Sequence, residues 1–304
     1  MSGVSVVILG SANVDVIIEL DRIPGPGETV LTDASDRGRG GKGNNQAIAA
    51  ARAGAPTVFL GAVGADESGD FLLEAQREAG IDVTHVRRIE DAPSGTAYVM
   101  VDSRAENAIV VVAGANGQLL SLTDAEREVL RGADALLMQL EVPMATVLEA
   151  AAQTKRAGGY VVLNAAPYAE LPDELIANLD LLMVNEHEAA LAAGRSGTPE
   201  ELAATIGERV PDVLITLGAA GSLLQRRGSD PVRINAPKVD AVDTTGAGDT
   251  FAGAYVAATV AGLPEQGRLE YAAAAAALAV QRPGAVASIP RADEIQDAVR
   301  RYFA

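Results

Sequence analysis

Short runs of valine, isoleucine and leucine alternate along this chain with longer segments that carry apolar residues at helical spacing. The short runs occupy residues 4–9, 57–60, 135–140, 160–163, 181–184 and 213–217. Strands that are buried on both faces of a parallel sheet have such unbroken apolar runs, and helices connect one to the next. The pattern therefore predicts an α/β fold of three layers, with a mostly parallel sheet between two layers of helices in one domain over residues 1–304.

Residues typical of helix ends lie where this alternation requires them. Thr198 is followed by a proline at the first helical position and by Glu201, which completes a capping box. The apolar segment 144–157 stops at Gly158, a common helix-ending residue. We therefore expect one helix to begin after Thr198 and another to fill residues 144–157.

Two stretches, 16–30 and 96–112, interrupt the alternation because no helical pattern lies inside either of them. The first contains an extended Ile-Pro-Gly-Pro-Gly segment, and the second has the pattern of two strands joined by a polar turn near residues 103–107. We expect the two stretches to form a small antiparallel sheet inserted into the α/β domain. Two ordinary long loops are the alternative.

Composition narrows the possible partners and cofactors. The 304 residues include 24 basic and 41 acidic side chains and no cysteine, so that the net charge is −17. This charge argues against a nucleic-acid binder and against anionic membrane surfaces, while the lack of cysteine excludes thiol catalysis, iron–sulfur clusters and disulfides. Residues 1–10 lack the basic segment of a signal peptide, and the longest apolar run, 271–280, is too short to span a membrane. A cytoplasmic protein is expected.

Polar residues follow most of the predicted strands. In open α/β sheets, ligands bind at the carboxyl ends of the strands, which these residues would line. The positions are Asn13, Asp15, Glu141, Asn164, Asn185, Glu186, His187, Glu188, Thr216 and Gly218. So many polar groups along one edge favour a polyhydroxylated substrate together with a nucleotide, although we expect some of them to act only as helix N-caps.

The segment 243–253, Asp-Thr-Thr-Gly-Ala-Gly-Asp-Thr-Phe-Ala-Gly, carries the clearest chemistry, and an apolar helix follows Asp249. Gly246 and Gly248 permit a tight turn that leaves backbone N–H groups free at the amino end of that helix, where anions bind. Asp249 could then take a proton from a hydroxyl that attacks a phosphate, which places an anion hole beside a base. The alternative is an acid that only begins the helix.

Other nucleotide motifs are incomplete. Gly-Ala-Gly at 246–248 is followed by Phe251 where a dinucleotide fold needs its third glycine, and Gly-Gly-Lys at 40–42 is followed by glycine instead of serine or threonine. The two histidines, His85 and His187, are too few for a multi-histidine metal site. A dinucleotide oxidoreductase and a Walker-type nucleotide site are therefore disfavoured.

Three segments, taken in order, resemble signatures of the PfkB-type carbohydrate kinases. Residues 40–46, Gly-Gly-Lys-Gly-Asn-Asn-Gln, are similar to the family's amino-terminal signature, and residues 243–249 are similar to its carboxyl-terminal one. Residues 185–188, Asn-Glu-His-Glu, resemble the family's Asn-x-x-Glu motif. The resemblance spans nearly the whole chain. It implies the family's three-layer αβα sandwich, with 16–30 and 96–112 as an inserted β-sheet lid that also pairs two subunits into a homodimer.

Further segments, among them 10–15 and 214–218, are most similar to those of family members that phosphorylate ribose. The resemblance therefore implies ATP-dependent phosphorylation of D-ribose at its 5-hydroxyl, giving ribose 5-phosphate and ADP, with Mg²⁺ and K⁺ as cofactors. Two alternatives stay open. One is a family member that acts on a different sugar, a sugar acid or a nucleoside, and the other is a non-catalytic sugar sensor on the same fold.

The resemblance also implies a role for each site residue. It assigns the sugar hydroxyls to Asn13, Asp15, Gly41, Lys42, Asn45, Glu141 and Asp249. It assigns the base to Asp249 and the anion hole to the amides of Gly246, Ala247 and Gly248. ATP would be bordered by Asn185, Thr216, Gly218, Gly221 and Gly248, and Mg²⁺ would be held through water by Glu188. K⁺ would be held by the loops that contain Asp243, Thr245, Ala279, Arg282, Gly284 and Ser288. A histidine common near the adenine in the family is absent, and Ala273 stands at about its place.

Overall fold

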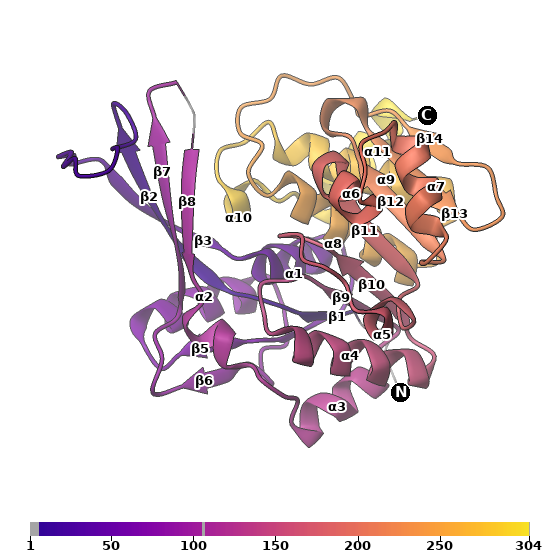
Figure 1. Cartoon of the computed structure of the whole chain (residues 1–304), viewed down its shortest axis with the longest axis horizontal. Coiled ribbons are helices and arrows are strands. Elements are labelled where there is room, and N and C mark those ends of the chain that lie inside the picture. Colours follow the sequence, from indigo (N-terminus) through magenta and orange to yellow (C-terminus); the bar gives the residue numbers. More distant parts are fainter. Residues whose placement is uncertain (1–5, 105–106, 304) are drawn as a thin grey trace.

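A computed structural model describes residues 6–104 and 107–303, and arranges them as a large sheet between two layers of helices, with a smaller sheet projecting from one end (Figure 1). The large sheet has eight strands in the order β14-β13-β12-β11-β10-β9-β1-β4. They are β1 (Val6–Leu9), β4 (Thr57–Leu60), β9 (Ala135–Met138), β10 (Tyr160–Asn164), β11 (Leu181–Asn185), β12 (Asp212–Thr216), β13 (Ser222–Arg226) and β14 (Val232–Ile234). Neighbours from β4 to β12 pair in parallel, whereas β13 and β14 pair antiparallel. The predicted mostly parallel α/β sheet is confirmed.

Helices cover both faces of this sheet, and successive residues of a strand point into different layers. Val6 and Ile8 of β1 belong to one hydrophobic core, and Val7 and Leu9 belong to the other. The first core is closed by α1 (Lys42–Arg52), α2 (Glu67–Glu78), α8 (Ala247–Val260), α9 (Glu265–Ala279), α10 (Ala285–Ser288) and α11 (Ala292–Tyr302). The second is closed by α3 (Asp124–Arg131), α4 (Met144–Ala157), α5 (Asp173–Ile176), α6 (Glu186–Ala193) and α7 (Pro199–Gly207).

The predicted helix ends are confirmed. The Thr198 side chain accepts a hydrogen bond from the backbone of Glu201, and the Glu201 carboxylate accepts one from the backbone of Thr198, so that α7 begins at Pro199 with a full capping box. The helix α4 ends at Gly158, whose φ of 87° is left-handed.

The smaller sheet differs from the expected one. It contains β2 (Asn13–Leu20), β3 (Ser35–Gly40), β7 (Gly95–Asp102) and β8 (Asn107–Val112), in the order β3-β2-β7-β8. The sheet is mixed, because β2 and β7 pair in parallel while the edge strands β3 and β8 pair antiparallel. The alternative of two long loops is wrong for the parts that lie in β2, β7 and β8, although residues 21–30 form no strand. The expected antiparallel pairing of the two stretches is wrong as well.

Short elements complete the description. A further two-stranded sheet joins β5 (Ala62–Gly64) to β6 (Arg87–Ile89), and single 3₁₀ turns lie at η1 (Gly114–Gln118) and η2 (Gly218–Ala220). Within residues 6–104 and 107–303, no helix combines the length and the apolar character that crossing a bilayer requires.

Candidate active site

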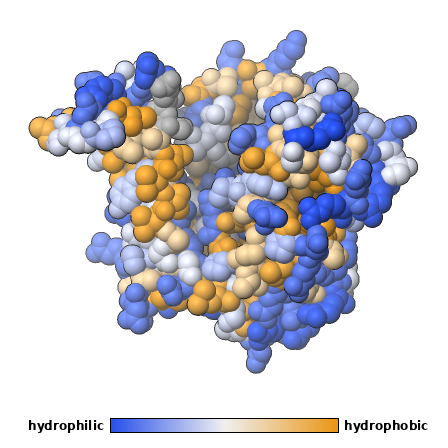
Figure 2. Space-filling view, viewed as in Figure 1, coloured by the Kyte–Doolittle hydropathy of each residue, from blue (hydrophilic) through white to orange (hydrophobic). Residues whose placement is uncertain are grey.

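The strand order places a crevice beside the carboxyl end of β1. The chain passes from β1 to its neighbour β4 on one side and returns later to β9 on the other, and ligands of open α/β sheets bind where the order diverges in this way. Asn13 follows β1 and Glu141 follows β9 at this point. Figure 2 shows the surface hollowed between the small sheet and the larger body.

Two glycines let the amino end of α1 lie directly against the bend between β1 and β2. A Cβ atom on Gly41 would lie 2.7 Å from the backbone nitrogen of Asn13, and one on Gly43 would lie 2.5 Å from that of Ser11. Gly41 also has a φ of 86°, which other residues rarely adopt. The close approach places Lys42, the first residue of α1, at the edge of the crevice.

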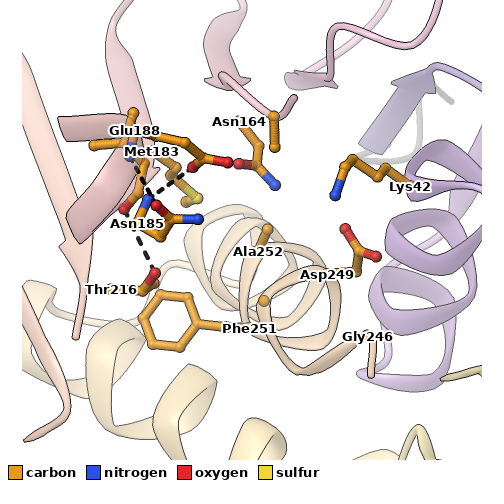
Figure 3. Close-up of a pocket in the computed structure, with 13 residues that line it drawn as sticks. Lys42, Asn164, Met183, Asn185, Glu188, Thr216, Gly246, Asp249, Phe251 and Ala252 are labelled. Atoms are coloured by element: carbon orange, nitrogen blue, oxygen red, sulfur yellow. Dashed lines mark hydrogen bonds between the residues drawn. The ribbon is translucent and has the colours of Figure 1, made fainter. Parts of the chain in front are cut away.

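Asp249 lies in the first turn of α8, beside α1. Its Oδ2 accepts a hydrogen bond from Asn45 Nδ2 at 3.0 Å, and its Oδ1 accepts one from Gln46 Nε2 at 2.8 Å. The two helices can come this close because Gly253 of α8 packs on α1, where a Cβ would lie 2.5 Å from the backbone oxygen of Gln46. Asp249 is 8% exposed, and Figure 3 shows its carboxylate facing the amino group of Lys42.

Burial and charge act in opposite directions on this pair. Burial is the largest influence on Asp249 and raises its pKa, and the positive charge of Lys42 and the two amide hydrogen bonds only partly counteract it. Burial alone would lower the pKa of Lys42, but Asp249, Glu141 and Glu188 surround it with negative charge and its pKa lies above the ordinary value. Lys42 therefore stays charged, and Asp249 is a stronger proton acceptor than an exposed aspartate.

The other acids and amides predicted for the sugar are held by a second set of contacts. Oε2 of Glu141 accepts hydrogen bonds from the backbone nitrogen of Lys42 at 3.0 Å and from Ser11 Oγ at 2.5 Å. Asn13 Oδ1 accepts a hydrogen bond from Asn116 Nδ2 at 2.8 Å. These contacts bring together the carboxyl ends of β1 and β9 and the start of α1, as the strand-end prediction requires.

Asp15 on β2 faces the same crevice. Its pKa is raised to about 6, chiefly by burial and then by the negative charges of Glu141 and Asp249. Gly40 leaves room for this side chain, because a Cβ there would lie 2.1 Å from Asp15 Oδ2. The crevice therefore holds several carboxylates around Lys42.

Sequence reasoning assigned no role to four polar side chains that hold the predicted ones: Ser11, Gln46, Asn116 and Gln139. Gln139 Nε2 donates to Gln46 Oε1, which orients the amide that Gln46 presents to Asp249. These four residues are buried. The sequence feature that could have indicated them is a polar residue inside or next to an apolar run, such as Gln139 directly after β9.

A pocket opens between Lys42 and Asp249 on one side and the ends of β10 and β11 on the other (Figure 3). Asn185 and Glu188 border it, and they form a capping box at the start of α6: Asn185 Oδ1 accepts from the backbone of Glu188, and Glu188 Oε2 accepts from the backbone of Asn185, each at 2.8 Å. Burial raises the pKa of Glu188. The motif thus has a local structural role, and its carboxylate also lines the pocket together with Asn164.

The turn before α8 has the predicted geometry with one exception. Gly246 caps the helix with a φ of 73°, which a glycine adopts without strain. The Ala247 N–H, expected in the anion hole, donates to the backbone oxygen of Thr244 at 3.2 Å. By contrast, the N–H groups of Gly246 and Gly248 donate no hydrogen bond to an acceptor in the described part of the chain.

A second pocket of about 420 Å³ adjoins the first and is mostly apolar. Thr216, Gly218, Gly221 and Gly248, all predicted beside a nucleotide, line it. Gly221 has a φ of 100° and passes so close to β14 that a Cβ would lie 1.9 Å from the backbone oxygen of Ile234. Ala273 also lines this pocket, with Ala276 and Ala277 one turn along α9. A flat apolar ring fits such walls.

The two loops predicted to hold a monovalent cation lie against each other. Oδ2 of Asp243 accepts a hydrogen bond from the Gly284 backbone at 2.8 Å, and Oδ1 accepts one from the Thr245 backbone at 2.9 Å. Burial would raise the pKa of Asp243, but the side chain and backbone of Thr245 and the backbone of Gly284 together hold it below the ordinary value. Ala279 and Ser288 lie at the two ends of the second loop, and the Arg282 side chain turns away to pair with Glu294. No cluster of three or more His, Cys, Asp or Glu side chains suited to a metal occurs among the described residues.

Comparisons with known proteins agree with this geometry. The ribokinase of Haemophilus influenzae is 38% identical over 293 residues, which make up 94% of this chain and 95% of that protein. The ribokinase of Arabidopsis thaliana is 36% identical over 295 residues, 93% of this chain and 78% of that protein.

Solved structures give the same result. The structure of Arabidopsis thaliana ribokinase complexed with ribose and ATP has a TM-score of 0.93 at 35% identity, and the match covers 98% of this chain and 99% of that one. Ribokinase from Thermotoga maritima has a TM-score of 0.90 at 34% identity, with the same coverage. The family model of the pfkB family carbohydrate kinases matches residues 4–292, and this chain therefore belongs to that family.

Proposed function

We propose that this protein transfers the γ-phosphoryl group of ATP to the 5-hydroxyl of D-ribose and releases ribose 5-phosphate and ADP. The observation that carries the proposal is the buried Asp249 carboxylate, which lies at the amino end of α8 between a polar crevice and a largely apolar pocket. A hydroxyl in the crevice and a phosphate in front of the helix would meet at this side chain. Relatives named ribokinase at 34–38% identity support ribose as the sugar.

Asp249 would act as the general base. Its raised pKa suits the removal of a proton from the attacking hydroxyl, and the hydrogen bonds from Asn45 and Gln46 fix its orientation. The proton passes to the carboxylate as the new O–P bond forms and the bond to ADP breaks. Free amides of Gly246 and Gly248 would stabilise the charge on the transferred group, and Lys42 adds a positive charge. The Ala247 N–H would contribute only after its hydrogen bond to the backbone oxygen of Thr244 breaks.

The sugar would be held by side chains that match its hydroxyls. Asp15 and Glu141 accept hydrogen bonds, Lys42 and Asn45 donate them, and Asn13 can do both. Charged partners strengthen such bonds in a buried crevice. Gly41 would bring its backbone close to the sugar because it has no side chain.

Mg²⁺ would be held near Glu188 and Asn185. The fit is good because the Glu188 carboxylate borders the pocket, and Mg²⁺ prefers oxygen ligands and keeps several waters. When bound, the ion would neutralise charge on the phosphates. Thr216, Gly218 and Gly221 would line the base of the nucleotide in the apolar pocket.

K⁺ would occupy the space between the two loops that Asp243 joins. The loops offer only oxygen ligands, namely the carboxylate of Asp243 and backbone carbonyls, which suit a hard cation. The ion would brace the turn that presents Gly246.

We expect kcat to fall when sodium or lithium replaces potassium at matched ionic strength, and Asp243→Ala to remove that difference. Asp240→Ala, a change at an exposed acid of the preceding loop, is the control. Equal turnover in the three salts would contradict the potassium site.

The small sheet would close over the sugar as a lid and pair two subunits. On its edge strand β8, Ile109, Val110, Val111 and Val112 are 46–56% exposed, and Figure 2 shows this apolar group over the strand. A patch of this kind is commonly covered by a partner, and we infer that a second copy covers it.

A cytoplasmic location is part of the proposed function, because cells hold ATP in the cytoplasm.

The decisive experiment measures ADP release with a panel of D-ribose, 2-deoxyribose, fructose, a keto-deoxy sugar acid and adenosine. We expect the highest kcat/KM with ribose. A deoxyribokinase of Salmonella typhi is 31% identical over 300 residues, so 2-deoxyribose is the competitor of most interest. Preference for the acid or for adenosine would favour the alternative kinases, and no turnover with any sugar would favour a sensor.

Asp249→Asn tests the base within the same assay. We expect kcat to fall about 10²-fold or more, as general bases commonly contribute, while ribose still binds. Asp124→Asn, at an exposed acid in the first turn of α3, is the matched control and should leave kcat unchanged. A mutant that keeps more than about half of the wild-type kcat would contradict the assignment.

A further inference from the structure

Arg52, in the last turn of α1, reaches a segment far along the chain. Its Nη1 donates to the backbone oxygens of Val286 at 2.8 Å and Ile289 at 2.9 Å. Both acceptor residues are buried. Because a guanidinium stays charged, its bonds to carbonyl oxygens are strong, and a single side chain ties the carboxyl end of α1 to α10 and to the residue after it.

Proline explains why the Val286 oxygen needs an outside donor. In an α-helix this oxygen would accept a hydrogen bond from the residue four places on, which is Pro290 and has no N–H. A buried carbonyl without a partner is unfavourable. Arg52 supplies the donor that Pro290 lacks, and it therefore adds a tie to α1 that the four-residue helix cannot make by itself.

The other side of α10 touches the turn that begins α8. A Cβ on Gly246 would lie 3.3 Å from the Cα and Cβ atoms of Ala285, the first residue of α10. One position earlier, the Gly284 backbone donates to Asp243 at 2.8 Å. The helix α10 also contacts β3 of the small sheet. It therefore lies between Arg52 and the glycine turn in front of Asp249.

We propose that Arg52 is a positioning residue for phosphoryl transfer, which holds α10 and thereby the Gly246–Gly248 turn. This inference rests on the proposed function. Arg52 lines neither pocket, so it acts through the backbone of α10. Lys42 and Asn45, which would bind the sugar, lie at the opposite end of α1, roughly 10–15 Å away at 1.5 Å per residue. Loss of Arg52 should therefore slow the chemical step and leave sugar affinity unchanged.

The test compares pre-steady-state phosphoryl transfer, with both substrates in excess over the enzyme, in the full-length protein and three variants. Arg52→Met keeps most of the length and removes the donors. Arg52→Lys restores a charged donor on a side chain one bond shorter, and one nitrogen is enough in principle because both oxygens accept from Nη1 alone. Arg77→Met is the matched control, since Arg77 lies exposed in the last turn of α2. The burst amplitude reports the folded, competent fraction, and the rate constant reports the geometry at the phosphate.

For Arg52→Met we expect a rate constant about tenfold lower at unchanged amplitude, because small misplacements of reacting groups are costly. The ribose Kd from calorimetry should match the wild type, and hydrogen exchange should become faster at residues 284–289. Arg52→Lys should recover much of the rate, and Arg77→Met should change nothing. A rate constant within twofold of the Arg77→Met control, or a lower amplitude alone, would overturn the proposal. An inactive wild type would contradict the proposed function instead, while the exchange comparison would still show whether Arg52 holds the segment.

Discussion

At the scale of single residues, the sequence predicts which group would act as the base but not what orients it. Asp249 follows a glycine turn at the start of an apolar helix, so its position can be predicted from local pattern alone. Its donor Gln46 is 203 positions away, and the hydrogen bond between Ser11 and Glu141 joins residues 130 positions apart. Such contacts depend on how helices and strands pack, and no local pattern contains them.

The proposed role of Asp15 in sugar binding predicts a dependence on pH. An acid whose pKa is raised by folding, here from 3.8 to about 6, binds its proton more tightly in the folded state, so stability falls as pH rises through that window. In the proposed role, Asp15 accepts hydrogen bonds from ribose as an ionised carboxylate, so we expect ribose binding to weaken below about pH 6, toward tenfold per unit. Calorimetric Kd values between pH 5 and pH 8 check this expectation.

Asp15→Asn separates the two effects. The variant should bind ribose more weakly at pH 8, lose the pH dependence of Kd and melt at a higher temperature than the ligand-free wild type at pH 8. Asp36→Asn, at an exposed acid on β3, is the control. A ribose Kd that stays constant from pH 5 to pH 8 in the wild type would show that Asp15 is not a charged partner of the sugar.

At the scale of elements, apolar runs locate the buried strands well and the exposed ones poorly. The run 57–60 matches β4 at both ends, because burial on two faces demands apolar side chains. The strand β3 has the sequence Ser-Asp-Arg-Gly-Arg-Gly and only its last residue is buried, so nothing in its composition indicates a strand. It forms because β2 offers it a pairing edge, which is a property of the neighbour.

The glycine at the start of α1 gives a prediction at this scale. Gly41→Ala forces a side chain to within 3 Å of the backbone of Ala12 and Asn13, and it adds backbone strain at a φ of 86°. Gly80→Ala has nearly the same φ, 79°, but nothing within 4 Å. Both should lose about 1 kcal/mol or more through strain. Gly41→Ala alone should lose at least tenfold in ribose affinity, because α1 and Lys42 must move.

Thermal unfolding and calorimetry with ribose distinguish these contributions. Equal losses of stability and equal ribose affinity in the two variants would show that the close approach of α1 to β2 does not shape the crevice. A larger loss in Gly41→Ala would assign the difference to the contact and not to the conformation.

At the scale of the whole molecule, the sequence predicts a projecting sheet but not its pairing. The stretches 16–30 and 96–112 lack helical pattern. The first contributes only the end of β2 to the smaller sheet, and the second contributes most of β7 and all of β8. Their parallel pairing, Asn13 with Gly95 onward, follows from where the chain leaves the large sheet and returns to it. The pattern of each strand alone is equally compatible with antiparallel neighbours.

The exposed face of β8 leads to the last prediction, which concerns assembly. A strand whose four consecutive residues Ile109 to Val112 are all about half exposed presents apolar side chains on both of its faces and an unpaired edge to water. A second copy that covers them would remove the exposure of the apolar side chains and would pair the free edge, so we expect a dimer in light scattering at micromolar concentration.

Ile109→Lys and Val110→Lys, one on each face, should shift the mass toward the monomer. Leu120→Lys introduces the same charge at a residue that is 64% exposed outside the small sheet, and it should leave the dimer intact. Because the same sheet would also close over the sugar, the monomeric variants should bind ribose more weakly than the Leu120→Lys control. A wild-type protein of strictly monomeric mass would show that water, and not a partner, covers β8.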